Sequence, residues 1–219
     1  MSIKIIESTA GPIASKLMEI GAIKLNYKKP FTWSSGWKSP IYCDNRLSLS
    51  YPDVRSYIKR CLSFAVTDNF KKPDVIAGVA TAGVPQGALV AEELGLPFVY
   101  VRPKPKDHGM ENLIEGRIEK GQSVVLIEDL ISTGGSSLKA ATALRDAGAK
   151  VAGMVAIFTY GFDEAEQNFK KAKCRLETLT NYTKLVNAAV EKEYVDEKSL
   201  KSLNEWRSNP AAWSAAISN

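Results

Sequence analysis

The chain has 219 residues, of which 45% are hydrophobic and 24% are charged, values that are ordinary for a globular protein with one sizeable core. The net charge is +5, but no basic run is interleaved with aromatic residues, so a nucleic-acid groove is not predicted. Neither a membrane-length apolar run nor the apolar core of a signal peptide is present. We therefore expect no nucleic acid and no membrane among the partners, and a cytoplasmic location.

The cysteines do not predict a disulfide framework. Cys43, Cys61 and Cys174 lie far apart in the sequence, and no C-x-x-C pair occurs. Their odd number also argues against systematic pairing. We expect three free, largely buried thiols.

The N-terminal part of the chain predicts one helix followed by an aromatic-rich segment. Ile13 and Leu17 have helical spacing and Gly21 is a stop signal, so residues 8–20 are expected to form an amphipathic helix. Residues 31–44 combine aromatics with a Ser-Gly turn and predict a β-hairpin or two short strands. These aromatics are suited to covering a flat ring, although packing against the core is the alternative interpretation.

From residue 51 onward, apolar runs alternate with helical patterns. We expect helices at residues 51–70, 86–94, 138–147 and 163–173, with two more between 183 and 206. Strands are expected at 73–80, 97–101, 124–127 and 151–159, a short hairpin at 113–121 and an edge strand at 173–179; the tail from residue 210 is weakly specified. This alternation predicts an α/β protein with a doubly wound parallel sheet.

The most informative stretch is residues 124–137, where a buried strand runs into two acids and then into a small-residue loop. Glu128 and Asp129 are followed by Gly134 and Gly135 and by hydroxyl donors, namely Ser132, Thr133, Ser136 and Ser137. Glycines allow backbone N–H groups to approach an anion, and the N-terminus of the next helix favours negative charge. Carboxylates beside an anion cradle suit a ligand that also carries hydroxyls. A sugar phosphate has both groups.

Other interpretations of this loop are less consistent with its residues. A Walker A loop ends in Lys-Ser or Lys-Thr, whereas the next cation here, Lys139, falls inside the predicted helix. The dinucleotide pattern G-x-G-x-x-G is absent. An ordinary strand-to-helix turn with an N-cap residue remains the simplest alternative.

Two further loops are expected near the same edge of the sheet. Residues 81–85 form a second small-residue loop after a predicted strand, where backbone N–H groups could hold a diphosphate. Residues 102–112 are polar and broken by prolines, which predicts an exposed loop. This loop carries Arg102, Lys106 and His108, which are suited to closing over a diphosphate and compensating the charge of a leaving group.

Three segments carry a family resemblance. Residues 127–136 resemble the phosphoribosyl-diphosphate-binding motif of type I phosphoribosyltransferases. Residues 31–42 resemble the hood pattern F-T-L-x-S-G-x-x-S-P-x-Y of orotate phosphoribosyltransferases, and residues 102–109 match their loop pattern R-x-x-x-K-x-H-G. The resemblance implies a type I phosphoribosyltransferase-like doubly wound parallel sheet with a small N-terminal hood. It implies one domain over residues 1–219, with a core at about 46–180 and a hood from about 1–45 plus part of the C-terminal region.

The resemblance also implies a reaction: transfer of a 5-phosphoribosyl group from phosphoribosyl diphosphate to orotate, giving orotidine 5′-phosphate and diphosphate in pyrimidine synthesis. Mg²⁺ is the implied cofactor, held mainly by substrate and water rather than by side chains. The implied assembly is a homodimer whose active sites are shared between subunits. In the family, the loop that corresponds to residues 102–109 reaches into the active site of the neighbouring subunit.

Residue roles follow from the same resemblance. Catalysis is assigned to Lys106, His108 and Asp129, and orotate contacts to Ser132 and Lys24. Contacts to phosphoribosyl diphosphate are assigned to Arg102, Lys106, His108, Glu128, Asp129, Leu130, Ile131, Ser132, Thr133, Gly134, Gly135 and Ser136.

Some positions depart from relatives. Ala82 and Pro103 stand where some relatives have lysine, and residues 159–162 stand where some have an arginine for the carboxylate of the base. The partner of that carboxylate therefore stays open. A purine or uracil phosphoribosyltransferase is one alternative, and a regulatory protein that senses phosphoribosyl diphosphate is another.

Overall fold

The computed structural model describes residues 3–26, 28–33, 36–104 and 113–218. Within these residues the main sheet has seven strands in the order β1-β11-β10-β9-β6-β7-β8, all parallel to their neighbours except β8. The strands are β1 (Lys4–Ile5), β6 (Val75–Val79), β7 (Phe98–Val101), β8 (Ile114–Glu115), β9 (Ser123–Ile131), β10 (Lys150–Thr159) and β11 (Leu176–Asn181). The predicted parallel sheet is confirmed.

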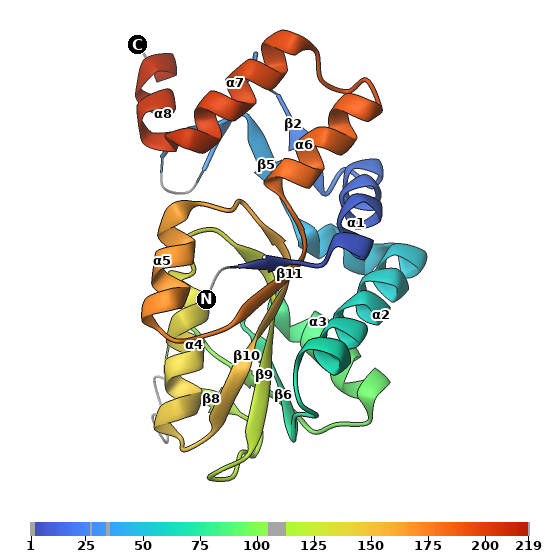
Figure 1. Cartoon of the computed structure of the whole chain (residues 1–219), viewed down its shortest axis with the longest axis vertical. Coiled ribbons are helices and arrows are strands. Elements are labelled where there is room, and N and C mark those ends of the chain that lie inside the picture. The colour runs from blue at the N-terminus through green and yellow to red at the C-terminus, as the bar shows by residue number, and fades with distance from the viewer. Residues whose placement is uncertain (1–2, 27, 34–35, 105–112, 219) are drawn as a thin grey trace.

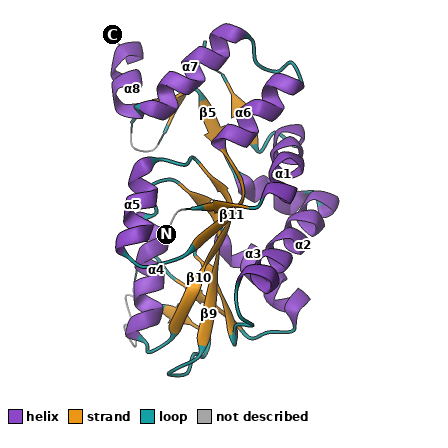
Figure 2. Ribbon diagram, in the orientation of Figure 1, coloured by secondary structure: helices purple, strands orange, loops and turns teal. Residues whose placement is uncertain are grey.

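Helices cover both faces of the sheet, as the doubly wound prediction requires (Figures 1 and 2). One face carries α1 (Glu7–Glu19), α2 (Pro52–Asn69) and α3 (Gly83–Leu94), and the other carries α4 (Gly135–Asp146) and α5 (Asp163–Lys171). In β9, Val125 and Ile127 pack toward the first face while Val124 and Leu126 pack toward the second. All four side chains are fully buried, because side chains alternate along a strand and both faces are covered.

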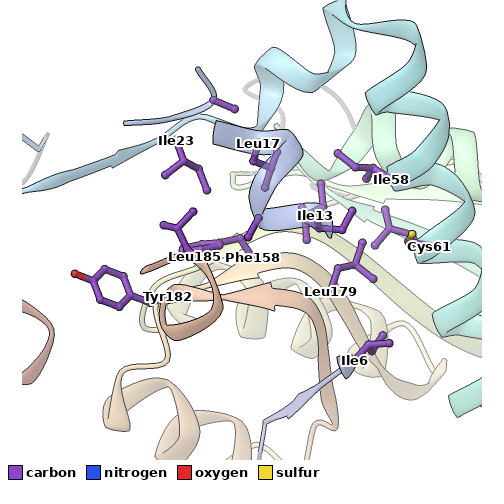
Figure 3. Close-up of a cluster of buried hydrophobic side chains, with 14 of the residues drawn as sticks. Ile6, Ile13, Leu17, Ile23, Ile58, Cys61, Phe158, Leu179, Tyr182 and Leu185 are labelled. Atoms are coloured by element: carbon purple, nitrogen blue, oxygen red, sulfur yellow. The ribbon is translucent and has the colours of Figure 1, made fainter. Parts of the chain in front are cut away.

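The N-terminal helix joins the sheet to the upper part of the molecule. Ile13 and Leu17 of α1 are fully buried beside Phe158, Leu179 and Leu185 (Figure 3). Before α1, β1 pairs with β11 through Lys4 and Glu177, so the first described residues belong to the main sheet. The expectation of an edge strand near residues 173–179 was wrong, since β11 lies between β1 and β10. A two-residue strand is too short to show a periodic pattern.

The hood combines short N-terminal strands with C-terminal helices, seen at the top of Figure 1. Strand β2 (Ile23–Leu25) pairs with β5 (Ile41–Cys43), and β3 (Phe31–Thr32) pairs with β4 (Lys38–Ser39). Helices α6 (Tyr182–Glu191), α7 (Glu197–Ser208) and α8 (Pro210–Ser218) complete the hood, and the 3₁₀ helix η1 (Asn45–Ser50) leads from β5 toward α2. Helix α8 occupies the tail that the sequence left weakly specified; its Ser214 Oγ accepts a hydrogen bond from Lys38 N at 2.8 Å.

An aromatic cluster fastens the hood to the core. Trp206 of α7 is 1% exposed and lies 5.6 Å from Trp33 and 5.7 Å from Tyr160, ring centroid to ring centroid. Phe162 and Tyr182 lie within 5.7 Å of the same tryptophan. Such aromatic pairs stabilise the packing of the hood on the core beyond the free energy of burying their surface.

Over the described residues, no helix is both long and apolar enough to cross a bilayer.

Two local predictions were displaced. The acidic pair at residues 128–129 was expected after the strand, but β9 continues to Ile131, so both acids lie within it. The hairpin expected at 113–121 is instead a single short strand, β8, that pairs antiparallel with β7. In both cases, hydrogen bonding to a neighbouring strand holds residues in a β-strand although their own β propensity is weak.

Candidate active site

The acidic pair near the end of β9 is held by hydrogen bonds within the fold. Glu128 is 6% exposed; its carboxylate accepts hydrogen bonds from Ser137 Oγ at 2.8 Å and from Asp129 N at 3.0 Å. Burial, followed by the charge of Asp129, raises the pKa of Glu128 well above its ordinary value. Ser137, which the sequence offered as a ligand donor, is 2% exposed and donates to Glu128. That expectation was wrong, because the first turn of α4 points this hydroxyl back to the strand.

Asp129 is the less enclosed acid of the pair. Its backbone carbonyl accepts a hydrogen bond from Asn45 Nδ2 at 2.7 Å, which ties β9 to the residue that follows the hood strands. Burial also raises the pKa of Asp129, while Glu128 and Arg46 act in the opposite direction. A hydroxyl or a cation that approached this carboxylate would stabilise its ionised form.

The loop after β9 has the shape of an anion cradle. Gly134 adopts a φ of +82°, and a Cβ placed there would lie 2.5 Å from Phe169 Cε2, so only glycine fits. Ser132 and Thr133 are half-buried, whereas Gly135 and Ser136 are exposed. No described side chain caps the first N–H groups of α4, which leaves them available to an anion. Ile131 is fully buried, so any ligand contact it makes is through its backbone.

The second small-residue loop lies against β9, beside the acidic pair. A Cβ on Gly83 would stand 2.5 Å from the carbonyl oxygen of Ile127, so the start of α3 approaches β9 as closely as a glycine permits. Among the described residues, no side chain caps α3 at its N-terminus. Ala80, Thr81 and Ala82 share a cavity of about 360 Å³ with Glu128, Asp129 and Ser136. We call it the acid cavity.

A second cavity, of about 690 Å³, lies between the hood and the loop after β9. We call it the aromatic cavity, because Trp33, Trp37, Tyr42 and Tyr160 line it together with Ser132 and Thr133. Both cavities are bordered by the same three residues: Cys43, Arg46 and Leu130. The two spaces therefore adjoin, and a ligand with a charged sugar at one end and a flat ring at the other can occupy both.

The remaining predicted residues fall in different places. Arg102 lies at the end of β7 with its Nη1 3.6 Å from Glu115 Oε1, and it lines a third cavity, of about 720 Å³, that also includes Gly135 and Ser136. Lys24 is exposed on β2, with its Cε beside the Gly21 turn, and it does not line the aromatic cavity. Lys106 and His108 lie outside the described residues.

Sequence reasoning missed two residues, Asn45 and Arg46. Asn45 is 1% exposed and connects the hood strands to Asp129, and Arg46 borders both cavities. A signal was available: two polar residues, Asn45 and Arg46, directly follow the aromatic segment. Their position beside the acidic pair of β9 depends on the tertiary structure alone, since more than eighty residues separate Asn45 from Asp129.

Three comparisons with known proteins agree on the family to which this chain is similar. Residues 51–197 match the family described as the phosphoribosyl transferase domain. The chain is 58% identical over 200 residues to the orotate phosphoribosyltransferase of Bacteroides fragilis, covering 91% of this chain and 94% of that protein. The crystal structure of orotate phosphoribosyltransferase from Aeropyrum pernix superposes with a TM-score of 0.72 at 28% identity, covering 84% of this chain and 99% of that one.

A longer structural neighbour matches over part of its length. Leishmania donovani UMP synthase superposes with a TM-score of 0.74 at 26% identity, over 90% of this chain and 42% of the neighbour. The present chain thus spans less than half of that protein. The matched domain, the relative that is similar over nearly its full length and the superposed crystal structure all indicate the same family. The chain belongs to the phosphoribosyltransferase family, within its orotate phosphoribosyltransferase branch.

Proposed function

We propose that this chain transfers the 5-phosphoribosyl group of phosphoribosyl diphosphate to orotate, giving orotidine 5′-phosphate and diphosphate in pyrimidine synthesis. One observation carries the proposal: a cavity with two acids and two uncapped helix N-termini adjoins an aromatic-walled cavity at Cys43, Arg46 and Leu130. The first suits a sugar diphosphate and the second suits a planar base. The anomeric carbon would then lie where the cavities meet.

The residues divide the work by their chemistry. Backbone N–H groups and hydroxyls from residues 131–136 hold the 5-phosphate at the start of α4. Asp129 accepts hydrogen bonds from ribose hydroxyls, and Glu128, which is tied to Ser137 and to Asp129 N, keeps that carboxylate in place. Ser132 borders the aromatic cavity, which supports its contact with both the sugar phosphate and the base. Lys24 remains a proposed orotate contact. Its flexible side chain, which lies beside Gly21, would have to rotate toward the aromatic cavity.

Mg²⁺ fits this arrangement as a substrate-borne ion. Among the described residues, no group of three or more histidine, cysteine or acidic side chains is placed to hold a metal. Mg²⁺ prefers oxygen ligands and retains several waters, so substrate oxygens and water would hold it, and the carboxylates of Glu128 and Asp129 would shape its surroundings. When bound, it would supply positive charge to the diphosphate and ribose oxygens.

Catalysis in this proposal relies on positioning and charge compensation. Orotate is a planar anion and diphosphate is a good leaving group, so the protein needs to align them and to neutralise charge as the C1–O bond breaks. Arg102, Lys106 and His108 belong to the loop assigned to the diphosphate. We propose that this loop serves the active site of a second subunit in a cytoplasmic homodimer.

The decisive assay follows the loss of orotate absorbance with purified chain, phosphoribosyl diphosphate and Mg²⁺. Omission of either co-reactant should abolish the change, and adenine, guanine, hypoxanthine and uracil should support little or no diphosphate release. Binding of phosphoribosyl diphosphate without any release of diphosphate in the presence of any of these bases would contradict the proposal. Lys106→Ala should lower turnover far more than it weakens phosphoribosyl diphosphate binding; equal losses would remove Lys106 from the transition state.

A further inference from the structure

Arg46 is the one positively charged side chain among the described residues that line the aromatic cavity. The base proposed for that cavity carries an exocyclic carboxylate, which needs a cationic or hydrogen-bonding partner when it leaves water. We propose that Arg46 binds this carboxylate and thereby selects orotate over uracil. The inference rests on the proposed function.

The guanidinium group is already oriented by its neighbour. Arg46 Nε and Nη2 donate to the two oxygens of Asp44 at 2.6 and 2.9 Å. A guanidinium has five donors in a planar fork, and two of them are used in this pair. Nη1 makes no hydrogen bond within the described part of the chain, so one edge of the fork remains free for a second carboxylate. Arg46 is thus held in place without being saturated.

The position of the group suits the junction of the two cavities. The Arg46 side chain is 61% exposed and lines both the aromatic cavity and the acid cavity. Tyr42 lines the aromatic cavity and Asp129 lines the acid cavity. A base that entered between them would cover the guanidinium and remove water from it, which strengthens a charged hydrogen bond.

Asp44 does not cancel this role. Its pKa is lowered by the hydrogen bond from Arg46, so it stays ionised and occupies one edge of the fork. Repulsion between Asp44 and an incoming carboxylate is offset because the guanidinium lies between them, as in other carboxylate–guanidinium–carboxylate arrangements. An arginine is better suited to this bridging than a lysine, whose charge is a single point without planar geometry.

Two lysines of the hood are rival partners. Lys38 Nζ donates to Thr32 Oγ1 at 2.9 Å, and Thr32 lines the aromatic cavity. Lys24 is paired in register with Tyr42 on the neighbouring strand. Neither lysine lines the cavity itself, and that difference favours Arg46.

The test compares two products that differ only in the carboxylate. Dissociation constants of orotidine 5′-phosphate and UMP are measured by calorimetry for the unaltered chain, Arg46→Met, Arg46→Lys and Lys38→Met. The unaltered chain should bind orotidine 5′-phosphate more tightly. Arg46→Met should reduce that preference by roughly 10- to 100-fold, the range for a lost charged hydrogen bond, with UMP affinity nearly unchanged; Arg46→Lys should fall between, and Lys38→Met should resemble the unaltered chain.

The outcomes separate this inference from the proposed function. A preference that survives in Arg46→Met, or that is lost equally in Lys38→Met, would overturn the role of Arg46. A collapse of UMP affinity in Arg46→Met would overturn it as well, since the side chain would then serve the fold or the sugar rather than the carboxylate. If the unaltered chain neither uses orotate nor prefers orotidine 5′-phosphate, the proposed function itself fails.

Discussion

The anion cradle and the aromatic cavity of the candidate site are built in opposite ways. The cradle comes from one contiguous stretch at the end of β9 and the start of α4, which also supplies Glu128, Asp129 and Ser136 to the acid cavity. The aromatic cavity is assembled from the hood strands, the loop after β9 and the residue that follows β10. A contiguous cradle depends on backbone conformation at a few residues. An assembled cavity depends on long-range packing, so the two should respond differently to mutation.

The largest effect is expected at the aromatic cluster that fastens the hood. Trp206→Ala removes a ring that is 1% exposed and should lower the free energy of unfolding by about 3–5 kcal/mol. It should also raise KM for the base more than KM for the sugar diphosphate, because Trp33 and Tyr160 touch both the cluster and the cavity. Chemical denaturation and steady-state kinetics measure the two effects.

Trp37→Ala is the matched control for this substitution. Trp37 is 43% exposed and lines the aromatic cavity. Its removal should change the free energy of unfolding by no more than about 1 kcal/mol, while it weakens binding of the base. Equal destabilisation by the two tryptophan substitutions would show that the cluster does not hold the hood.

The next effect concerns the contiguous cradle. Gly134→Ala forces a Cβ into the left-handed region and against Phe169, which should cost about 2–4 kcal/mol of unfolding free energy. The neighbouring Gly135→Ala is the control, since its nearest neighbour would be Thr133 Oγ1 at 3.9 Å; its unfolding free energy should barely change. If both substitutions cost the same, the shape of the cradle does not depend on the backbone conformation of Gly134.

Asn45 joins the two regions and should have a smaller effect. Asn45→Ala removes the hydrogen bond to the half-buried carbonyl of Asp129, at a cost of about 1–3 kcal/mol. Because Asn45 directly precedes Arg46 and supports Asp129, kcat/KM for both substrates should fall together. A loss confined to one substrate would mean that Asn45 belongs to one region rather than to the junction.

The smallest effect is a pH-dependent change at Glu128. Burial raises the pKa of Glu128 above the ordinary value of 4.5. The contribution of this group to the free energy of unfolding is therefore complete below pH 4.5 and is lost as the pH rises through the raised pKa. Glu128→Gln carries no charge and can keep its bonds to Ser137 and Asp129 N. Near pH 8 its Tm should exceed that of the unaltered chain by about 2–4 °C, roughly 1 kcal/mol at this chain length.

Melting curves from pH 4 to pH 8 check this expectation. The gain should shrink toward acid pH, where Glu128 of the unaltered chain is itself protonated. A difference that stays constant across the range would show that ionisation of Glu128 is not the cause.

The sequence by itself determined the parts that depend on local pattern. The apolar run at 124–127 predicted a strand covered on both faces, and the acids and glycines that follow it predicted an anion cradle for a hydroxyl-bearing ligand; the buried strand is confirmed and the glycine geometry fits the cradle. These features depend on residues a few positions apart, where side-chain alternation and backbone freedom act directly.

Only the tertiary structure decided the rest. The two-residue strand β1, the orientation of Ser137 toward Glu128, the helix at the C-terminus and the meeting of Asn45 and Arg46 with Asp129 have no local pattern that specifies them. Each results from contacts between segments far apart in the chain, whose free energy appears only when the core and the hood pack together. The physical reason is that single-sequence patterns report which face of an element is apolar, but they do not report which other element that face will meet.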